Sequence, residues 1–305
     1  MATKDKVLIY GAGGVQGGAV ARKLLNEGDT VHTIVRSSDK AAELRKRGIT
    51  AFVGDLSDAD SLTSAHDGVS KVFLLLPVDY DLERNRQFIH NTVDAAKHAN
   101  VKLLVFNTSG FVPDDITGVT AYDIKRELIA YVKQSGIPSI ILQPTFYMEN
   151  FLIPGVVGNQ TLAYPIPADS AITWISMEDA AAYGVYALNH PELAGQALPI
   201  VGPELLTGNQ LAEKFSAALD REIQFFSLPV EAFEEALAPV LGKETAAGLA
   251  DSYKWIGLNT NLLPKPDQVI DELRTAAPGT PLVEWVKQAA QHGFFAPAAG
   301  ENVNS

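Results

Sequence analysis

The sequence has 305 residues, 47% of them hydrophobic and 20% charged, which is enough for a large α/β domain with an added lobe. Its formal net charge of −12 at pH 7 argues against nucleic acid and anionic membranes as partners. The absence of cysteine excludes disulfides, Cys-ligated zinc and a cysteine nucleophile, and it fits a reducing cytoplasm.

No apolar stretch has the length of a membrane span. The longest continuous apolar run, Val72 to Val78, is far shorter than the roughly 18 residues that a spanning helix needs. The N-terminal MATKDK lacks the apolar region of a secretion signal. We therefore expect a cytoplasmic protein that does not bind membranes.

Apolar runs alternate with helical segments through the first half of the chain. Because the runs are rich in Val, Ile and Leu on both faces, they predict a parallel sheet covered by helices on both sides, the doubly wound α/β fold. Ligands in such folds bind beyond the carboxyl ends of the strands. The predicted strands are Lys6–Tyr10, Thr30–Arg36, Thr50–Leu56, Lys71–Val78, Leu103–Ser109 and Ser139–Thr145, with helices near 15–27, 39–47, 58–66, 81–99 and 122–135.

The first predicted strand runs directly into GAGGVQGG. Glycines gathered between a strand and a helix indicate positive φ angles or a close approach to the backbone. A flexible linker is the alternative, but linkers are not usually flanked by regular structure on both sides. The strand, glycine turn and helix favour a nucleotide-binding turn, where backbone N–H groups meet a phosphate. The loop residues assigned to the cofactor are Gly11, Gly13, Gly14, Val15, Gln16 and Gly17.

The spacing of Gly11, Gly14 and Gly17 resembles that of the short-chain dehydrogenase superfamily. Its extended and atypical branches usually have Thr where this chain has Gly13. An NAD-preferring site normally has Asp or Glu about 20 residues beyond the glycines. Here Arg36 stands 19 residues after Gly17, and Ser37 and Lys40 follow. A guanidinium binds phosphate well, so this pattern favours NADP(H), unless Arg36 is only a solvated residue at a helix start.

The later strand ends carry further candidate contacts with the cofactor. A carboxylate and a leucine after the third strand suit the adenine, although the carboxylate also suits a turn that begins the next helix. Leucine and proline after the fourth strand suit an apolar wall, although proline also terminates strands. Polar residues after the fifth strand suit the middle of the cofactor. These candidates are Asp55, Leu56, Leu76, Pro77, Asn107, Thr108 and Ser109.

The helix after the fifth strand departs from the dehydrogenase pattern. Catalytic members use Tyr-x-x-x-Lys, but the residue four before Lys125 is Ala121, and Tyr122 is only three before it. Residues three apart still share a helix face, so Tyr122 and Lys125 are the candidate catalytic residues. The alternative for Tyr122 is a residue at the start of a helix with no chemical role.

The segment YDIKRELIAYVKQSGIPSIILQPTFYMENF resembles the NmrA-like family of atypical short-chain dehydrogenases. Gln143 departs from the family, in which Arg usually precedes the proline. The residues that match the family pattern are Lys125, Glu127, Ser135, Gly136, Ile137, Pro144, Phe146, Met148, Glu149 and Asn150. The resemblance covers roughly residues 5 to 295. It implies an NADP(H)-preferring Rossmann domain with a small C-terminal lobe.

The aromatic-rich segment after the sixth strand is expected to end the cofactor site and to begin the acceptor pocket, although aromatic residues at such places are often core. The cofactor contacts expected there are Pro144, Thr145 and Phe146, and the acceptor contacts are Phe146, Tyr147, Asn150 and Phe151. The helical pattern beyond it, with Thr207 and Gln210 as a capping box, predicts a mostly helical lobe. We expect a Rossmann domain at 1–153, rejoined by 172–203, and a smaller lobe at 154–171 and 204–305.

Two functions are open for such a chain. The family includes reductases that transfer hydride from NADPH and regulators that bind NADP without known turnover. Lys125 falls on the lysine of several reductase relatives, which favours an NADPH-dependent reductase of small conjugated acceptors such as quinones, enones or aryl carbonyls. The alternative is a non-catalytic NADP(H) sensor that acts through a protein partner. The histidines contain no i, i+4 pair, so we expect no metal site.

Overall fold

The computed structural model describes residues 5–296, so the first four residues of MATKDK lie outside it. The chain divides into two compact units, described separately below. Unit 1 contains residues 5–144, 177–200 and 269–277, and unit 2 contains residues 145–176, 201–268 and 278–296. The sequence attaches 145–153 and 172–176 to the Rossmann domain, whereas their contacts group them with unit 2.

Unit 1 is built on a seven-stranded parallel sheet in the order β10-β6-β5-β4-β1-β2-β3. The doubly wound fold is therefore confirmed. The strands are β1 Lys6–Ile9, β2 Thr30–Val35, β3 Thr50–Val53, β4 Lys71–Leu74, β5 Leu103–Asn107, β6 Ser139–Pro144 and β10 Ala197–Ile200. Each predicted strand ends earlier than expected, because the residues at its carboxyl end leave the ladder to form the loops of the site.

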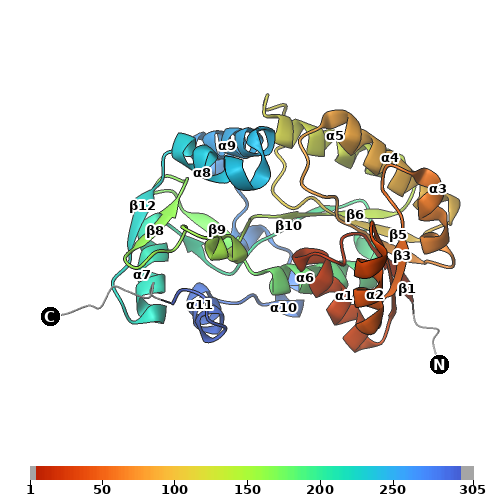
Figure 1. Cartoon of the computed structure of the whole chain (residues 1–305), viewed down its shortest axis with the longest axis horizontal. Coiled ribbons are helices and arrows are strands. Elements are labelled where there is room, and N and C mark those ends of the chain that lie inside the picture. Colours follow the sequence, from red (N-terminus) through yellow and green to blue (C-terminus); the bar gives the residue numbers. More distant parts are fainter. Residues whose placement is uncertain (1–4, 297–305) are drawn as a thin grey trace. The chain divides into compact units, whose positions relative to one another are not determined.

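Helices cover both faces of this sheet. Figure 1 shows α3, α4 and α5 on one side and α1, α2, α6 and α10 on the other. The helices of unit 1 are α1 Val15–Glu27, α2 Ser38–Lys46, α3 Ala59–Leu62, α4 Leu82–His98, α5 Thr120–Gln134, α6 Met177–Asn189 and α10 Asp271–Ala276, with short 3₁₀ turns η1 Thr63–His66 and η3 Pro191–Leu193. Chain segments leave β1 and β4 toward opposite faces, which opens a crevice between these two strand ends.

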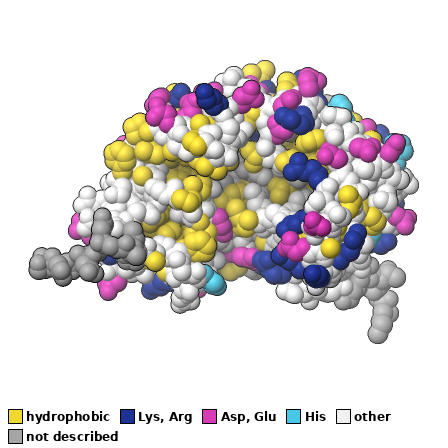
Figure 2. Space-filling view, viewed as in Figure 1, with side chains coloured by type: hydrophobic (Ala, Val, Ile, Leu, Met, Phe, Trp, Pro, Cys, Tyr) yellow, Lys and Arg dark blue, Asp and Glu magenta, His cyan; other side chains and the backbone are white. Residues whose placement is uncertain are grey.

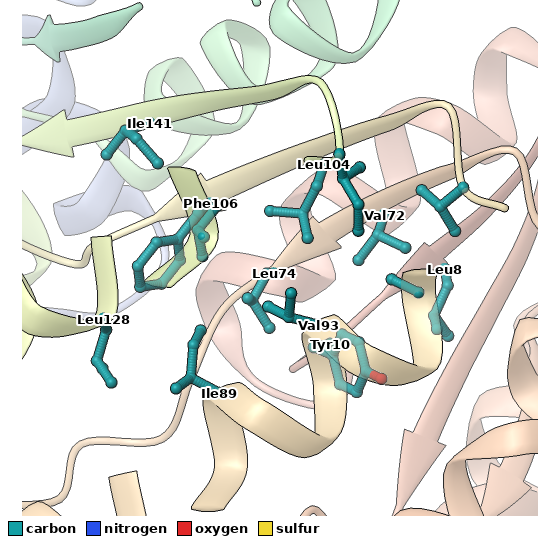
Figure 3. Close-up of a cluster of buried hydrophobic side chains, with 14 of the residues drawn as sticks. Leu8, Tyr10, Val72, Leu74, Ile89, Val93, Leu104, Phe106, Leu128 and Ile141 are labelled. Carbon is teal, nitrogen blue, oxygen red and sulfur yellow. The ribbon is translucent and has the colours of Figure 1, made fainter. Parts of the chain in front are cut away.

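The core of unit 1 fixes the strand ends that carry the site. Figure 3 shows Leu74 on β4 packed among side chains of α4, including Val93. Both are completely buried, and each contributes roughly 1.5 to 3 kcal/mol to the free energy of unfolding. β1 and β4 run side by side, with Ile9 paired to Phe73. The loops that follow these strands therefore start from a rigid, common edge.

Unit 2 holds two small sheets. In the first, β9 Ile172–Ile175 lies between β11 Leu205–Leu206 and β7 Phe146–Tyr147, and in the second β12 Gln224–Ser227 pairs with β8 Thr161–Tyr164. Its helices are α7 Gly208–Leu219, α8 Val230–Leu241, α9 Lys243–Leu258 and α11 Leu282–Gln291, with 3₁₀ turns η2 Met148–Leu152, η4 Thr260–Leu262 and η5 Pro266–Gln268. The predicted capping box of Thr207 and Gln210 is confirmed at the start of α7. Within residues 5–296, no helix combines the length and apolarity needed to cross a membrane.

Candidate cofactor site

The glycine loop is a tight turn that only glycine fits at two positions. Gly11 has a φ angle of +82°, and its carbonyl oxygen accepts a hydrogen bond from the Gly14 N–H at 2.9 Å. A Cβ added to Gly17 would lie 2.4 Å from that same oxygen. Gly11 therefore supplies a left-handed backbone, and Gly17 permits the close packing of helix on turn.

The N-terminus of α1 is open to an anion. Gly14 is its N-cap residue and has no side chain to cap the helix, and the first turn, which begins with Val15 and Gln16, has no acidic residue. Backbone N–H groups at a helix N-terminus and the positive end of the helix dipole favour a phosphate there. This geometry suits the pyrophosphate of a dinucleotide, and the contact of the loop with it stays a prediction.

Arg36 is the first residue after β2 and is exposed. Figure 2 shows Lys and Arg side chains gathered over the region of α1 and α2, mixed with carboxylates. Ser37, expected to contact the cofactor, caps α2 by accepting a hydrogen bond from the Lys40 N–H at 3.2 Å. This cap orients the first turn of α2, so that Lys40 starts from a fixed backbone position beside the glycine loop.

Asp55 forms the turn that the sequence offered as its alternative role. Its Oδ1 accepts hydrogen bonds from the Ser57 N–H at 2.8 Å and from the Ser57 hydroxyl at 2.6 Å. These bonds, together with the nearby Arg36 guanidinium, hold the pKa of Asp55 below its usual value. The carboxylate is therefore ionised at neutral pH and oriented, which suits an acceptor for an adenine amine.

The loop after β4 contributes an additional residue. Leu56 and Leu76 are partly buried against the core cluster, and Pro77 is exposed. Leu75, which the sequence did not single out, lies closest to the turn: a Cβ on Gly11 would be 3.2 Å from its Cδ2. Three consecutive leucines precede Pro77, and only the register of β4 distinguishes the one that faces the glycine loop.

The end of β5 approaches the glycine loop from the other side. Ser109 adopts a φ angle of +54°, which is strained for a residue with a Cβ, and its N–H donates to Asn107 Oδ1 at 2.8 Å. Its hydroxyl donates to Gln16 Oε1 at 3.5 Å. Thr108 Oγ1 lies 3.0 Å from the Leu142 carbonyl oxygen, which ties the loop to β6. The structure thus brings together Gln16 and Ser109, 93 residues apart in the sequence.

Lys125 reaches this loop from α5. A Cβ on Gly110 would lie 3.3 Å from its Nζ, and burial lowers the pKa of Lys125 to about 8. Burial raises the pKa of Tyr122 above its usual value, and the neighbouring Tyr80 raises it further. Tyr80, in the loop after β4, has a pKa raised by burial to about 12. The sequence missed Tyr80, although it stands only three residues beyond Pro77.

The candidate residues of unit 2 form part of an aromatic cluster. The ring of Phe146 lies 5.1 Å from that of Trp174, and the ring of Phe151 lies 4.4 Å from Trp174. Phe151 and Tyr147 are buried, while Phe146 and Asn150 are partly exposed. Asn150 Nδ2 donates a hydrogen bond of 3.0 Å to the Tyr164 hydroxyl. The Tyr164 hydroxyl also shares a hydrogen bond of 2.5 Å with the Tyr253 hydroxyl.

Two further predicted contacts lie at the end of β6. Pro144 is the last residue of β6 and is buried. Thr145 Oγ1 accepts a hydrogen bond from Thr173 Oγ1 at 3.0 Å. Contacts of Pro144, Thr145 and the aromatic cluster with a cofactor or an acceptor stay predictions. Among the described residues, no three His, Cys, Asp or Glu side chains gather as a metal site.

Comparison with known proteins agrees with the fold. The profile of the NmrA-like family matches residues 3–294. The chain is 29% identical over 297 residues to an NAD(P)H azoreductase of Xenophilus azovorans, covering 96% of this chain and 100% of that protein. An NADPH-dependent quinone oxidoreductase from Escherichia coli, solved with NADPH, has a TM-score of 0.78 and 25% identity, covering 93% of this chain and 99% of that one.

A third similar structure has a different role. NmrA, a negative transcriptional regulator solved in complex with NADP, has a TM-score of 0.73 and 19% identity, with 98% of each chain covered. This likeness concerns the fold alone. The same architecture therefore occurs in a protein described as a reductase and in one described as a regulator, and the choice between these functions depends on the residues of the site.

Proposed function

The chain belongs to the NmrA-like family, and we propose that this NAD(P)H-dependent oxidoreductase transfers a hydride from NADPH to small conjugated acceptors such as quinones, enones or aryl carbonyls. The azoreductase and the quinone oxidoreductase described above, both acting on conjugated compounds by their names, support this class of acceptor.

The residues of unit 1 suit the cofactor from end to end. The uncapped N-terminus of α1 suits the pyrophosphate, and Arg36 suits the 2′-phosphate. Leu75 packs against the glycine turn, since a Cβ on Gly11 would lie 3.2 Å from its Cδ2. When bound, NADPH supplies the hydride, and the protein holds and orients it.

The position of Lys125 is the observation that carries the reductase proposal. Hydride transfer to a carbonyl or a quinone leaves negative charge on an oxygen, and a preorganised ammonium stabilises that charge. Lys125 places its Nζ against the backbone of Gly110, in the loop that follows β5. A pKa near 8 also suits proton donation at neutral pH, which completes reduction of the oxygen to a hydroxyl.

The two buried phenols play a different part. Because burial raises the pKa of Tyr80 and of Tyr122, both stay protonated at neutral pH. Because their pKa values lie above that of Lys125, they release a proton less readily than its ammonium does. The usual Tyr-x-x-x-Lys dyad, in which the lysine lowers the pKa of the phenol, has no counterpart in this pair, and we assign the proton transfer to Lys125.

A panel of quinones, enones, aryl carbonyls and azo dyes, each mixed with NADPH and the protein, tests the proposal through the loss of NADPH absorbance. Turnover above the reaction of free NADPH with at least one class supports it. Rates equal to those of free cofactor throughout the panel favour the second candidate, an NADP(H) sensor that acts through a protein partner. The regulator with the same fold is the observation behind that candidate.

The remaining expectations from the sequence are kept as proposals. A cofactor domain of 1–153, rejoined by 172–203, and a smaller substrate or partner lobe of 154–171 and 204–305 stay the expected division of the chain. A cytoplasmic location and the lack of nucleic-acid partners also stay predictions. A small-molecule acceptor is the partner that agrees with the reductase relatives.

A further inference from the structure

Tyr10, the last residue before the glycine turn, is anchored at both ends. Its N–H donates to the Phe73 carbonyl oxygen on β4 at 2.9 Å. Figure 3 shows its ring inside the core of unit 1. Its hydroxyl lies 3.4 Å from Nε2 of His66, the last residue of η1. Because Gly11 follows directly, the turn starts from a residue whose backbone and side chain are both held.

The hydrogen bonds of His66 determine which of its ring nitrogens carries the proton. Nδ1 lies 2.9 Å from the Leu62 carbonyl oxygen, which only accepts, so Nδ1 is protonated. Nε2 of the neutral ring is therefore an acceptor, and the Tyr10 hydroxyl is its donor. Burial raises the pKa of Tyr10, so the phenol keeps this proton at neutral and acid pH. The bond thus depends on the charge state of His66.

The surroundings of His66 disfavour its charged form. Burial lowers the pKa of His66 below the ordinary value of 6.5, the bond to Leu62 offsets only part of this effect, and a charge on His32, on β2, lowers it further. On β1, Lys6 Nζ donates to the backbone carbonyl oxygen of the exposed Asp67 at 2.9 Å, and neither of these charged residues shifts the pKa of His66. Among the described residues, no charged side chain of β3, α3 or α4 shifts it either.

Protonation of His66 removes the acceptor of the Tyr10 hydroxyl. The charged ring donates from both nitrogens, so the phenol proton is left in an apolar core without a partner, which costs free energy. Movement of the Tyr10 ring relieves this cost. The turn that follows has little room to absorb such a movement, since a Cβ on Gly17 would lie only 2.4 Å from the Gly11 carbonyl oxygen. A shift of Tyr10 is therefore passed on to the glycine loop.

We propose that His66 is a positioning residue for the dinucleotide: its neutral ring holds Tyr10, and with it the glycine turn, in the arrangement that binds the cofactor, and uptake of a proton releases this arrangement. His66 acts through Tyr10 and does not itself contact the cofactor. Affinity for the dinucleotide should therefore fall in acid. The inference rests on the proposed function, since it requires that the glycine loop bind a dinucleotide.

The test is a series of calorimetric titrations with NADP⁺ between about pH 5 and pH 8, the range in which histidine changes charge. The variants are His66→Gln and Tyr10→Phe. The matched control is His98→Gln, because His98 Nδ1 makes the same bond to a carbonyl oxygen four residues earlier, that of Asp94, at 2.7 Å, but is exposed. Thermal unfolding at each pH shows where each protein is folded. The 2′-phosphate titrates in the same range, but equally in all four proteins, so their differences isolate His66.

We expect the acid decline in affinity to be about threefold to tenfold larger in the wild type than in His66→Gln, the size of one hydrogen bond. Tyr10→Phe, which has no phenol proton to leave unpaired, should show the same flattened profile, and His98→Gln should follow the wild type. A folded His66→Gln protein with the full wild-type decline overturns the inference. Nitrogen NMR of the histidine rings decides independently of any variant: at neutral pH His66 should carry its proton on Nδ1, and a proton on Nε2 contradicts the inference.

Failure of the proposed function is seen separately. A wild-type protein that binds neither NADP⁺ nor NAD⁺ at any pH contradicts the dinucleotide site and the inference together. A wild-type protein that binds NADP⁺, with an affinity that changes with pH in the same way in all four proteins, contradicts the inference alone.

Discussion

The ammonium of Lys125, on α5, lies against the backbone of Gly110, which follows β5. A Cβ added to Gly110 would be 3.3 Å from Lys125 Nζ. This contact places a positive charge at the carboxyl edge of the sheet. We predict that Lys125→Ala lowers kcat by about 10² to 10³, or about 3 to 4 kcal/mol, the usual cost of removing one donor to a developing oxyanion. Affinity for NADPH should fall much less. Steady-state kinetics at saturating NADPH, with a separate binding titration, measure both effects.

The matched control for this variant is Lys133→Ala, which removes a lysine from the last turn of the same helix. It should leave kcat within about twofold of the wild-type value, since exposed surface substitutions have small effects. If Lys125→Ala keeps its turnover and instead loses NADPH affinity, the lysine only holds the cofactor, and its catalytic role is wrong.

The pH dependence of kcat should report the titration of Lys125. Burial lowers its pKa to about 8, so the ammonium is present below that pH and is lost as the pH rises through it. If the ammonium is the form that stabilises the oxyanion, kcat falls above about pH 8. Lys125→Arg should abolish this decline, because a guanidinium does not lose its proton in this range. A decline at the same pH in Lys125→Arg would assign the titration to another group.

Tyr122→Phe should have a much smaller effect on kcat than Lys125→Ala, below about tenfold. The reason is that burial raises the pKa of Tyr122 and lowers that of Lys125 to about 8, so the phenol is the poorer proton donor of the two. Kinetics of Tyr122→Phe and of Tyr80→Phe, which each remove one phenol hydroxyl, provide the comparison. A loss in Tyr122→Phe as large as that in Lys125→Ala would restore the dyad that the sequence lacks.

The sequence was sufficient for six of the seven strands of the sheet and for most of the glycine turn. Continuous apolar runs predict buried parallel strands, and the positions of Gly11 and Gly17 follow from the spacing alone, since no other residue fits a turn this close. The crossing of chain segments toward opposite faces then places the site at the carboxyl ends of the strands. These features depend on local patterns of a few residues, which a single sequence contains.

Other features depend on tertiary contacts that no local pattern contains. The register of β4 decides that Leu75, rather than Leu76, faces Gly11. Likewise, the sequence attaches 172–176, which contains β9, to the Rossmann domain, whereas the pairing of β9 with β7 and the ring contact of Phe151 with Trp174 group it with unit 2. Tyr80 lies close enough to Tyr122 to raise its pKa, and no local sequence pattern indicates that proximity.

Arg36→Ala should weaken NADPH binding by about 1.5 to 3 kcal/mol and change NADH binding little, which is the range for a hydrogen bond to a charged group. Arg36 is exposed immediately after β2, where the ribose of a dinucleotide binds in this fold. Fluorescence titrations with NADPH and with NADH measure the two affinities. An equal loss for both cofactors would mean that Arg36 acts on a group other than the 2′-phosphate.

Gly17→Ala should lower the stability of the protein, whereas Gly14→Ala, in the same loop, should lower its affinity for the cofactor. A Cβ on Gly17 would lie 2.4 Å from the Gly11 carbonyl oxygen and 2.5 Å from its carbonyl carbon, so Gly17→Ala forces the backbone to move. We expect it to lower the free energy of unfolding by about 1 to 3 kcal/mol, as overpacking does. A Cβ on Gly14 would meet the same oxygen at 3.4 Å, an ordinary contact, and Gly14 has an extended backbone that alanine adopts.

Gly14→Ala should therefore keep nearly the wild-type stability. It should still weaken NADPH and NADH alike, because the added methyl group stands at the N-terminus of α1, where the pyrophosphate common to both cofactors would approach the backbone. Denaturant unfolding and dinucleotide titration of the two variants measure these effects. A Gly14→Ala protein with full stability and unchanged affinity for both cofactors would show that the pyrophosphate does not bind at this helix terminus. A methyl group added at the binding position would otherwise weaken both cofactors.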